Sequence, residues 1–249
     1  MLFRSSMQNV LANLCVVMVE TSHPGNIGSA ARAMKTMGIH DLRLVAPRKP
    51  FSQDSWALAS GANDVLEQAK IVPSLPEAIA DCHIVIGASA RAERTLQWPL
   101  MDARQCGEFV GARLGEQKIA LVFGRERSGL SNEELEYCQT LVHIPMAYDY
   151  ISLNIAASIQ VICYECAMAV RNTVGIPQDE EPLVTAGAME SFYQHLQQTL
   201  IQTQFLDPEN PGLMMRRFRR LFGRSSVTSS EMKLLRGMLN AFTPDKPNA

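Results

Sequence analysis

The chain has 249 residues, of which 47% are hydrophobic and 19% charged, and its 23 basic and 25 acidic side chains give a formal net charge of −2. This composition is typical of a globular protein and excludes a disordered, collagen-like or coiled-coil chain. The net charge alone gives no reason to expect a nucleic-acid partner. No stretch approaches the roughly 18 consecutive apolar residues of a membrane span, and no signal peptide is recognisable, so the sequence predicts a cytoplasmic protein.

Short β-branched runs alternate with longer helix-like segments over the first part of the chain. This alternation predicts an α/β domain with a mostly parallel sheet. The expected buried strands are Leu14–Val19, Leu42–Ala46, Ile84–Ala88, Ile119–Phe123 and Leu141–Pro145. The helices expected between them are Ile27–Met37, Ser55–Gln68, Leu75–Ala80, Asp102–Leu114 and Asn132–Cys138.

The next expected helix, Ser152–Asn172, has 14 apolar residues among 21, and they occupy almost every face. A surface helix would be apolar on one side only. We therefore expect this helix to pack on its own sheet and on a second copy of the chain, which makes the protein a homodimer; a helix covered wholly within its own domain is the alternative. Cys163 and Cys166 form a C-x-x-C, but without a second pair or a nearby histidine they are interpreted as core residues, and no metal is expected.

The C-terminal part is predicted to be a small all-α appendage behind a linker. Thr173–Thr185 contains Pro177, Pro182 and an acidic run, which neither packs nor continues a helix. Helical spacing follows at Ala186–Gln204, Gly212–Phe222 and Ser229–Phe242.

A cluster of arginines lies on the second helix of this appendage. Phe218, Leu221 and Phe222 are expected to face inward, leaving the arginines as a phosphate-binding patch. A solvated charged face is the alternative. The arginines are Arg216, Arg217, Arg219, Arg220 and Arg224.

Three segments carry candidate chemistry, and the first, "HPGNIGSAARAMK" (His23–Lys35), follows the first strand. A strand, a glycine-rich turn and a helix N-terminus together form an anion site from backbone N–H groups. The glycine spacing does not match a dinucleotide fingerprint. Arg32 suits a phosphate because its planar fork cannot lose its charge, although a tight turn with a surface arginine explains the same residues.

The other two segments follow later strands. In "LVFGRERSGLSNEE" (Leu121–Glu134), charged residues in a glycine-bounded loop after a buried strand indicate a ligand crevice, and a structural turn is the alternative. In "IPMAYDYISLNIAASIQV" (Ile144–Val161), Ser152 and Asn154 lie at the start of the buried helix, where they could instead simply cap it.

Together, in this order and with these spacings, the three segments resemble the three motifs of the SPOUT methyltransferases, in the branch that methylates ribose 2′-hydroxyls of tRNA and rRNA. The resemblance covers about residues 14–172. It implies a Rossmann-like sheet with a C-terminal trefoil knot and S-adenosylmethionine (SAM) as the cofactor. It also implies methylation of tRNA, at nucleotide 32 of the anticodon loop (cytidine or uridine). An rRNA 2′-O-methyltransferase and a non-catalytic RNA-binding protein of the same fold are the alternatives.

The resemblance also implies residue roles, and together with the linker and the helical spacing described above it sets the domain limits. Because an arginine with a pKa above about 12 stays protonated, we interpret Arg32 as an electrostatic clamp on phosphate and developing alkoxide. Relatives commonly carry a second serine where this chain has Ile151, so only a backbone contact survives there. The domains are 14–172 (methyltransferase), 173–185 (linker) and 186–242 (tRNA-binding appendage). The implied catalytic residues are Arg32, Asn26, Glu126, Ser152 and Asn154; the cofactor-binding residues are Ala88, Ser89, Ala90, Gly124, Ile144, Ile151, Ser152 and Leu153; and Arg94 joins Arg216, Arg217, Arg219 and Arg220 as an RNA contact.

Overall fold

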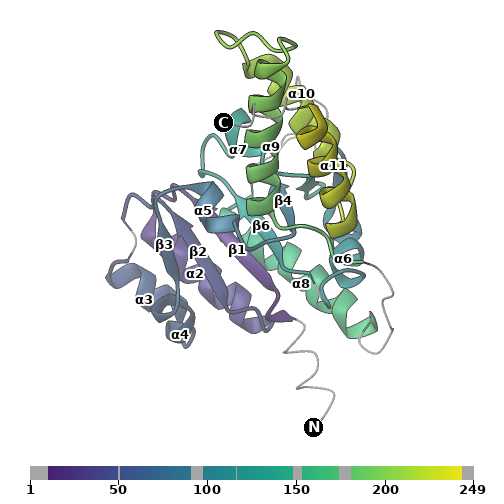
Figure 1. The fold of residues 1–249 in the computed structure, drawn as a ribbon. Helices are drawn as coiled ribbons and strands as arrows, with labels where there is room; N and C mark the ends of the chain where they lie inside the picture. The colour runs from purple at the N-terminus through teal and green to yellow at the C-terminus, as the bar shows by residue number, and fades with distance from the viewer. Residues whose placement is uncertain are drawn as a thin grey trace.

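The computed structural model describes residues 11–49, 51–90, 98–115, 117–147, 153–173 and 181–242. Its centre is a seven-stranded sheet in the order β3-β2-β1-β6-β4-β7-β5, and every neighbouring pair is parallel (Figure 1). The predicted α/β class is therefore confirmed. The strands are β1 (Leu14–Val19), β2 (Asp41–Val45), β3 (Lys70–Val72), β4 (Ile84–Ala88), β5 (Leu100–Asp102), β6 (Ile119–Phe123) and β7 (Thr140–His143).

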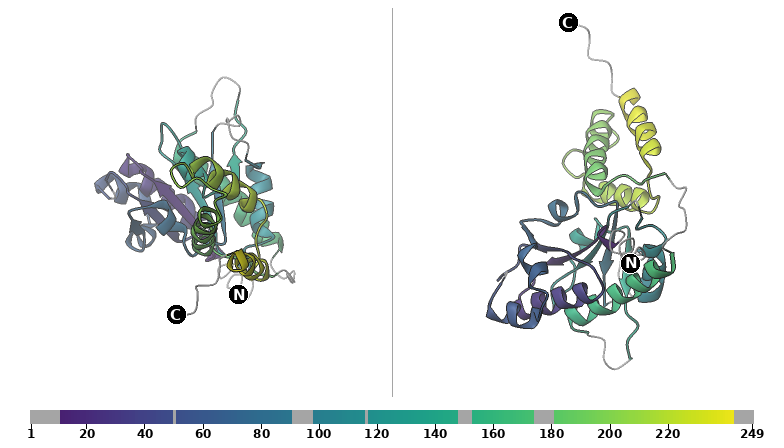
Figure 2. Two further views of the ribbon diagram at one scale, coloured as in Figure 1. Left: turned by 45° about the horizontal axis from the view of Figure 1, so that its top comes forward. Right: turned by 90° about the horizontal axis from the view of Figure 1, so that it is seen from below.

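Helices cover both faces of this sheet, and three more form the appendage, the green and yellow part of Figures 1 and 2. The helices of the α/β domain are α2 (Pro24–Thr36), α3 (Gln53–Ala59), α4 (Asn63–Glu67), α5 (Leu75–Ile79), α6 (Ala103–Gly111), α7 (Asn132–Leu135) and α8 (Ile155–Thr173). The appendage consists of α9 (Ala186–Gln202), α10 (Gly212–Gly223) and α11 (Ser229–Phe242).

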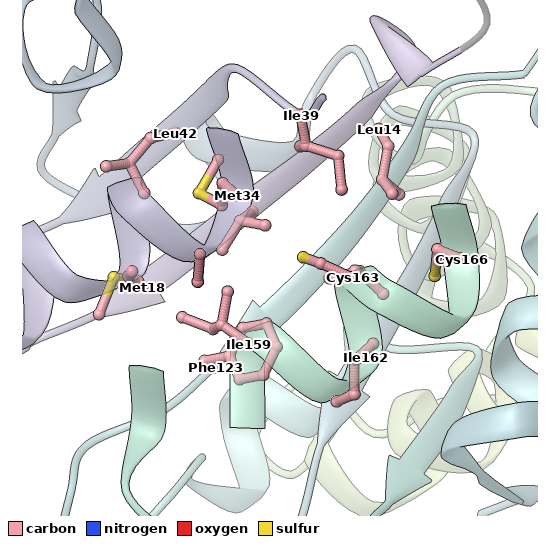
Figure 3. Close-up of a cluster of buried hydrophobic side chains, with 14 of the residues drawn as sticks. Leu14, Met18, Met34, Ile39, Leu42, Phe123, Ile159, Ile162, Cys163 and Cys166 are labelled. Carbon is pink, nitrogen blue, oxygen red and sulfur yellow. The ribbon is translucent and has the colours of Figure 1, made fainter. Parts of the chain in front are cut away.

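The strand β1 is apolar along its whole length because both of its faces are covered by helices. Side chains alternate between the two faces of a sheet. On β1, Leu14 and Met18 join the core under α2 and α8, whereas Cys15 and Val17 join the core under α5 and α7. Figure 3 shows the first of these cores, with Met34 of α2 and Ile159 of α8 among its side chains.

Several boundaries differ from the sequence predictions. The expected helix Ser55–Gln68 is two helices, because Ser60 and Gly61 take φ values of 41° and 90° and break the helix between α3 and α4. The strands β3 and β5 were not predicted; each has three residues and lies at an edge of the sheet, so neither carries a long buried run. The helix α2 begins at Pro24 rather than near Ile27, since proline fits the first helical turn.

The apolar helix α8 is covered largely within its own chain. It packs on the sheet and between α2 and α6. Two glycines let α6 approach closely, because a Cβ at Gly107 would lie 2.6 Å from the Glu165 carbonyl oxygen and one at Gly111 would lie 2.8 Å from Ala169 Cβ. The intradomain alternative thus accounts for most of the burial, and the homodimer stays a prediction. Cys163 and Cys166 are buried free thiols, as expected for core residues.

The appendage has a core of its own and docks on the α/β domain. Two amides at the start of α9 donate to carbonyls after α5: Ala186 N to Cys82 O at 2.6 Å and Gly187 N to Ala80 O at 3.1 Å. In the predicted linker, Leu183 forms an isolated β-bridge with Thr228 of the appendage. The predicted domain limits and the trefoil knot stay predictions; the connection from β7 to α8 passes through residues 148–152, outside the described part.

No helix in the described ranges is both long and apolar enough to cross a bilayer.

Candidate functional site

A cavity of about 420 Å³ lies at the carboxyl edge of β4, β6 and β7. Its floor is apolar, from residues such as Phe123, Val142 and Ile162, and its rim is polar. Ligand crevices of open parallel sheets lie at this edge. Of the eight predicted cofactor-binding residues, six line the cavity: Ala88, Ser89, Ala90, Gly124, Ile144 and Leu153. The other two, Ile151 and Ser152, lie outside the described residues, as does Arg94.

The Glu126 carboxylate forms the rim between this cavity and α2. It accepts hydrogen bonds from Ser22 Oγ at 2.8 Å, from Asn26 Nδ2 at 3.0 Å and from the backbone amides of Ser22 and His23 at 3.2 Å each. An anion thus lies beside the start of α2, but it is the protein's own carboxylate, and the amides that bind it belong to the two residues before the helix. Gly25 and Gly28 lie inside the helix and not in a phosphate-binding turn.

Asn154 joins the third motif to the same network. Its Nδ2 donates to Asn26 Oδ1 at 3.0 Å, and its Oδ1 accepts from the backbone amide of Ala156 at 2.9 Å, so it also caps α8. The capping role and the site role proposed for Asn154 are thus compatible. Asn154, Asn26 and Glu126 form one hydrogen-bonded chain that ties all three motifs together.

The pKa of Glu126 is lowered to about 2. Burial raises this pKa, but hydrogen bonds from its own amide, from Ser22 and from Asn26 outweigh burial. The carboxylate is consequently ionised near neutral pH, where it can accept hydrogen bonds but cannot donate a proton. So low a pKa also makes it a poor proton acceptor. Glu126 is therefore suited to positioning Asn26 and the start of α2.

Glu126 is expected to make the stability of the protein depend on acid pH. Its folded-state pKa of about 2 lies below the ordinary value of 4.5, so its contribution is present above the ordinary value and is lost as the pH falls toward 2. Glu126→Gln should flatten the free energy of unfolding across this window relative to wild type. Urea unfolding at a series of pH values measures this. Glu67→Gln, at the exposed end of α4, is the control; curves for Glu126→Gln that run parallel to wild type would contradict the assignment.

The loop that carries Glu126 is fixed at both ends. The Arg125 guanidinium donates to both carboxylate oxygens of Glu134 at 3.0 Å, and its Nε donates to Glu20 at 3.0 Å. The backbones of Arg125 and Gly129 exchange two hydrogen bonds, and Gly129 takes a φ of 69°, which favours glycine. Arg125 is thus a structural residue, and both interpretations of this loop hold: it is a structural turn and it borders a crevice.

Arg32 is exposed on α2 and does not line the cavity. No hydrogen bond or salt bridge engages its guanidinium within the described ranges. Arg127, at the exposed tip of the second-motif loop, lines the cavity and has no such partner among the described residues either. Both cations are thus available to an anionic ligand.

The arginines of α10 divide into two groups. Arg219 binds Glu190 with two hydrogen bonds of 2.6 and 2.8 Å and lies 4.5 Å over the Tyr193 ring, so it holds α10 to α9. Arg216 pairs with Glu136 of the α/β domain at 2.9 Å, and Arg220 lies 5.7 Å over Trp98. These contacts assign docking roles to three of the predicted RNA contacts. Arg217 and Arg224 remain exposed.

One predicted orientation on α10 is wrong. Phe218 and Phe222 pack into the core of the appendage, but Leu221 is 48% exposed. With 3.6 residues per turn, Leu221 lies about 120° around the helix from Met215. It is therefore at the edge of the face that Met215, Phe218 and Phe222 turn toward the core of the appendage.

Sequence reasoning missed Ser22, His23 and Arg127 as site residues. Ser22 and His23 act mainly through backbone amides, which a side-chain motif does not reveal. Arg127 lies in the second motif, in the glycine-bounded loop. Its two charged neighbours, Arg125 and Glu126, bind other residues of the protein, which leaves Arg127 as the charged residue of this loop that faces a ligand. No group of three or more His, Cys, Asp or Glu is placed to hold a metal ion in the part of the chain described here.

Comparison with known proteins gives two matching family models. The SpoU rRNA methylase family matches residues 13–164, and the C-terminal domain of the tRNA methyltransferase TrmJ matches residues 187–248. The chain therefore belongs to the SpoU methylase family, and its resemblance to the SPOUT methyltransferases is confirmed.

Within that family, the chain is similar to TrmJ over nearly its whole length. It is 48% identical to the "tRNA (cytidine/uridine/adenosine-2′-O-)-methyltransferase TrmJ" of Pseudomonas aeruginosa, across 92% of this chain and 93% of the relative. The crystal structure of TrmJ from Z. mobilis superposes with a TM-score of 0.80 at 31% identity, covering 91% and 97% of the two chains. The SpoU methyltransferase AviRb from Streptomyces viridochromogenes, solved with the cofactor AdoMet (SAM), matches at 26% identity and a TM-score of 0.50, over 64% and 60%.

Proposed function

We propose that this chain transfers a methyl group from SAM to the ribose 2′-hydroxyl of tRNA, at nucleotide 32 of the anticodon loop. The observation that carries the proposal is the hydrogen-bonded chain of Asn154, Asn26 and Glu126, which brings three distant motifs to one edge of the cavity. The proposal is supported by the name of the Pseudomonas relative and by the TrmJ-type C-terminal model.

The cavity fits SAM. Its volume of about 420 Å³ lies within the range of roughly 300 to 1,000 Å³ found for small-molecule sites. Its apolar floor suits an adenosine ring, and the polar backbone at Ala88–Ala90 and Gly124 can provide hydrogen bonds. When bound, SAM supplies a methyl group on a positively charged sulfur.

The residues of the site position the acceptor rather than remove its proton. Asn26 is held by Glu126 on one side and by Asn154 on the other, so its place at the start of α2 is fixed. Arg32 binds the phosphate beside the target ribose and stabilises the developing alkoxide, because a guanidinium stays charged. Most of the rate then comes from alignment of the reacting atoms. The proton leaves to solvent through Ser152 or through water.

The partners follow from the same reaction. Arg217 of α10 and Arg224, the residue that follows α10, are exposed and contact tRNA phosphates. The protein is a homodimer in the cytoplasm, where its tRNA substrate is found. The outer side of α8 supports the dimer, because Tyr164 is 47% exposed there and Val161 and Met168, on the same side of the helix, are only partly covered.

We expect purified protein to methylate an unmodified tRNA transcript with SAM. Mass spectrometry of nuclease fragments measures the position, and we expect one 2′-O-methyl group at nucleotide 32. Transcripts with cytidine, uridine or adenosine at this position measure base preference, and a transcript with a 2′-deoxynucleotide there is the control.

The same assay separates the alternatives. Methylation of ribosomal RNA and not of tRNA would identify an rRNA enzyme. RNA binding without methylation of any RNA would identify a non-catalytic protein. Methylation of the 2′-deoxy control would show that the acceptor lies elsewhere.

A further inference from the structure

We infer that residues 46–49 and 51–52, which lie between β2 and α3, bind single-stranded RNA together with the first turns of α3, beside the hydrogen-bonded chain of Asn154, Asn26 and Glu126. A nucleobase stacks on Trp56, and Arg48 and Lys49 bind the neighbouring phosphates. We call the surface formed by Arg48, Lys49, Phe51 and Trp56 the α3 platform. The inference rests on the proposed tRNA substrate and adds a contact on a side of the site where neither the cofactor cavity nor the appendage lies.

The sheet order places the α3 platform in line with the site. The carboxyl edges of parallel strands lie side by side, and β2, β1 and β6 are neighbours in that order. The loop after β6 carries Glu126, and the segment after β1 carries Ser22. The segment after β2 follows directly, because the Arg48 amide donates to the Thr21 carbonyl at 3.2 Å. A strand of RNA that leaves the cavity over Glu126 therefore meets Arg48 and Lys49 next.

The start of α3 is fixed against the start of α2. Ser55 Oγ donates to the Pro24 carbonyl oxygen at 2.9 Å, and the Ser52 amide donates to Ser55 Oγ at 3.1 Å. Pro24 stands two residues before Asn26 of the catalytic network. Trp56, which follows Ser55, is thereby held at a constant place relative to the site.

The aromatic pair has the form of a stacking surface. Phe51 packs partly against the main core, and its ring centroid lies 5.7 Å from that of Trp56. Trp56 itself is 38% exposed, although an indole is mostly buried in folded proteins. An exposed ring anchored from behind can stack with any nucleobase, since every base has a π-face.

The charges of the α3 platform suit a polyanion. Arg48 and Lys49 are exposed, and neither side chain has a hydrogen bond or salt bridge in the described ranges. The acid near Arg48 is Glu20, whose pKa is lowered mainly by its hydrogen bond from Arg125 and also by the charge of Arg48. Asp54, in the first turn of α3, is also exposed. Its single negative charge is smaller than the two positive charges of Arg48 and Lys49, so the surface stays net positive. Basic side chains beside an exposed aromatic ring are typical of single-strand binding.

Fluorescence tests the stacking directly, because Trp56 and Trp98 are the two tryptophans of the chain. In the Trp98→Phe variant, the emission comes from Trp56 alone. We expect it to be quenched when an anticodon stem-loop RNA is added, and to change little with heparin, a polyanion without bases. No quenching by RNA, or equal quenching by heparin, would overturn the stacking.

Substitution tests the contribution to affinity. Trp56→Ala should raise the KM for tRNA about tenfold, which corresponds to about 1.4 kcal/mol of lost stacking, and Trp56→Phe should restore most of it. Each phosphate contact with a single strand contributes about 0.7 to the slope of log affinity against log salt. The double variant Arg48→Ala with Lys49→Ala removes two such contacts and should reduce this slope by about 1.4. SAM affinity, kcat and the melting temperature should change little. The control is Arg104→Ala, an exposed residue on α6 at the far edge of the sheet.

The experiments distinguish a failure of the α3 platform from a failure of the proposed function. Normal methylation with an unchanged KM and salt slope in all variants would overturn the α3 platform alone. A wild-type protein that methylates no RNA would overturn the proposed function. If RNA then still quenches Trp56 and the variants still weaken binding, the platform stands as a surface of an RNA-binding protein.

Discussion

Replacing Arg32 with alanine is expected to lower methyl transfer to tRNA by about a hundredfold or more, while the affinity for SAM stays near wild type. The magnitude follows from loss of a charged group that acts on the transition state, which typically changes rates by about 10²–10³. Arg32 lies outside the cavity lining, so cofactor binding should not need it. Its side chain is exposed and unpaired among the described residues, so the free energy of unfolding should change by no more than about 0.5 kcal/mol.

Single-turnover methylation and titration calorimetry with SAM measure these two effects separately. Arg32→Lys should recover little activity, because a point charge does not replace a planar fork with paired donors. Lys35→Ala is the matched control: Lys35 lies three residues further along α2 and pairs with Asp64 at 2.7 Å, in an exposed ion pair that contributes little to stability. Loss of SAM binding in Arg32→Ala would show that the residue serves the cofactor.

A methyl group at Gly28 is expected to destabilise the protein by about 3 kcal/mol or more. An ideal Cβ at this position would lie 2.0 Å from the Ser55 carbonyl oxygen, so α2 and α3 would have to separate along a buried contact. Gly25→Ala is the matched control on the same helix. Its Cβ would meet Leu58 Cδ1, the end of an exposed side chain, at 2.9 Å, and that side chain can move.

The changes in the free energy of unfolding of the two glycine variants should therefore differ strongly in size, and they can differ in sign. Gly25→Ala gains less helix propensity than the roughly 0.5 to 1 kcal/mol of a helix interior, because Gly25 lies in the first turn of α2. This gain partly offsets the displacement of Leu58. Urea unfolding gives both free energies. Equal destabilisation of the two variants would show that α3 does not approach α2 at Gly28 as closely as 2.0 Å implies.

These glycines also show where reasoning from the sequence succeeded and where it stopped. The position of the first motif was predictable because the buried strand β1, which precedes it, is an unbroken apolar run in the sequence. The role of its glycines was not, since a phosphate-binding turn and a close helix contact both require a missing side chain. The residue that decides between them, Ser55, lies 27 positions from Gly28 and in no motif.

The candidate site was predictable to the extent that its side chains stand in motifs. Glu126 and Asn154 were assigned through the resemblance, and the structure joins both to Asn26. The partners that complete the network are backbone amides at Ser22 and His23, which have no side-chain signature. The arginines of α10 were counted correctly, but the sequence could not show that Arg219 faces Glu190, because that contact depends on how two helices pack.

The ion pairs that Arg125 forms with Glu20 and Glu134 affect how a ligand binds in the cavity. Because Glu20 and Glu134 hold this guanidinium from two elements, and Gly129 closes the loop onto itself, the wall of the cavity that carries Glu126 exists before any ligand arrives. A ligand that binds against a preformed wall loses little conformational entropy there. This wall therefore acts as a rigid template that cannot adapt to a bulkier cofactor analogue, so a compound that exploits it must match its shape at the outset.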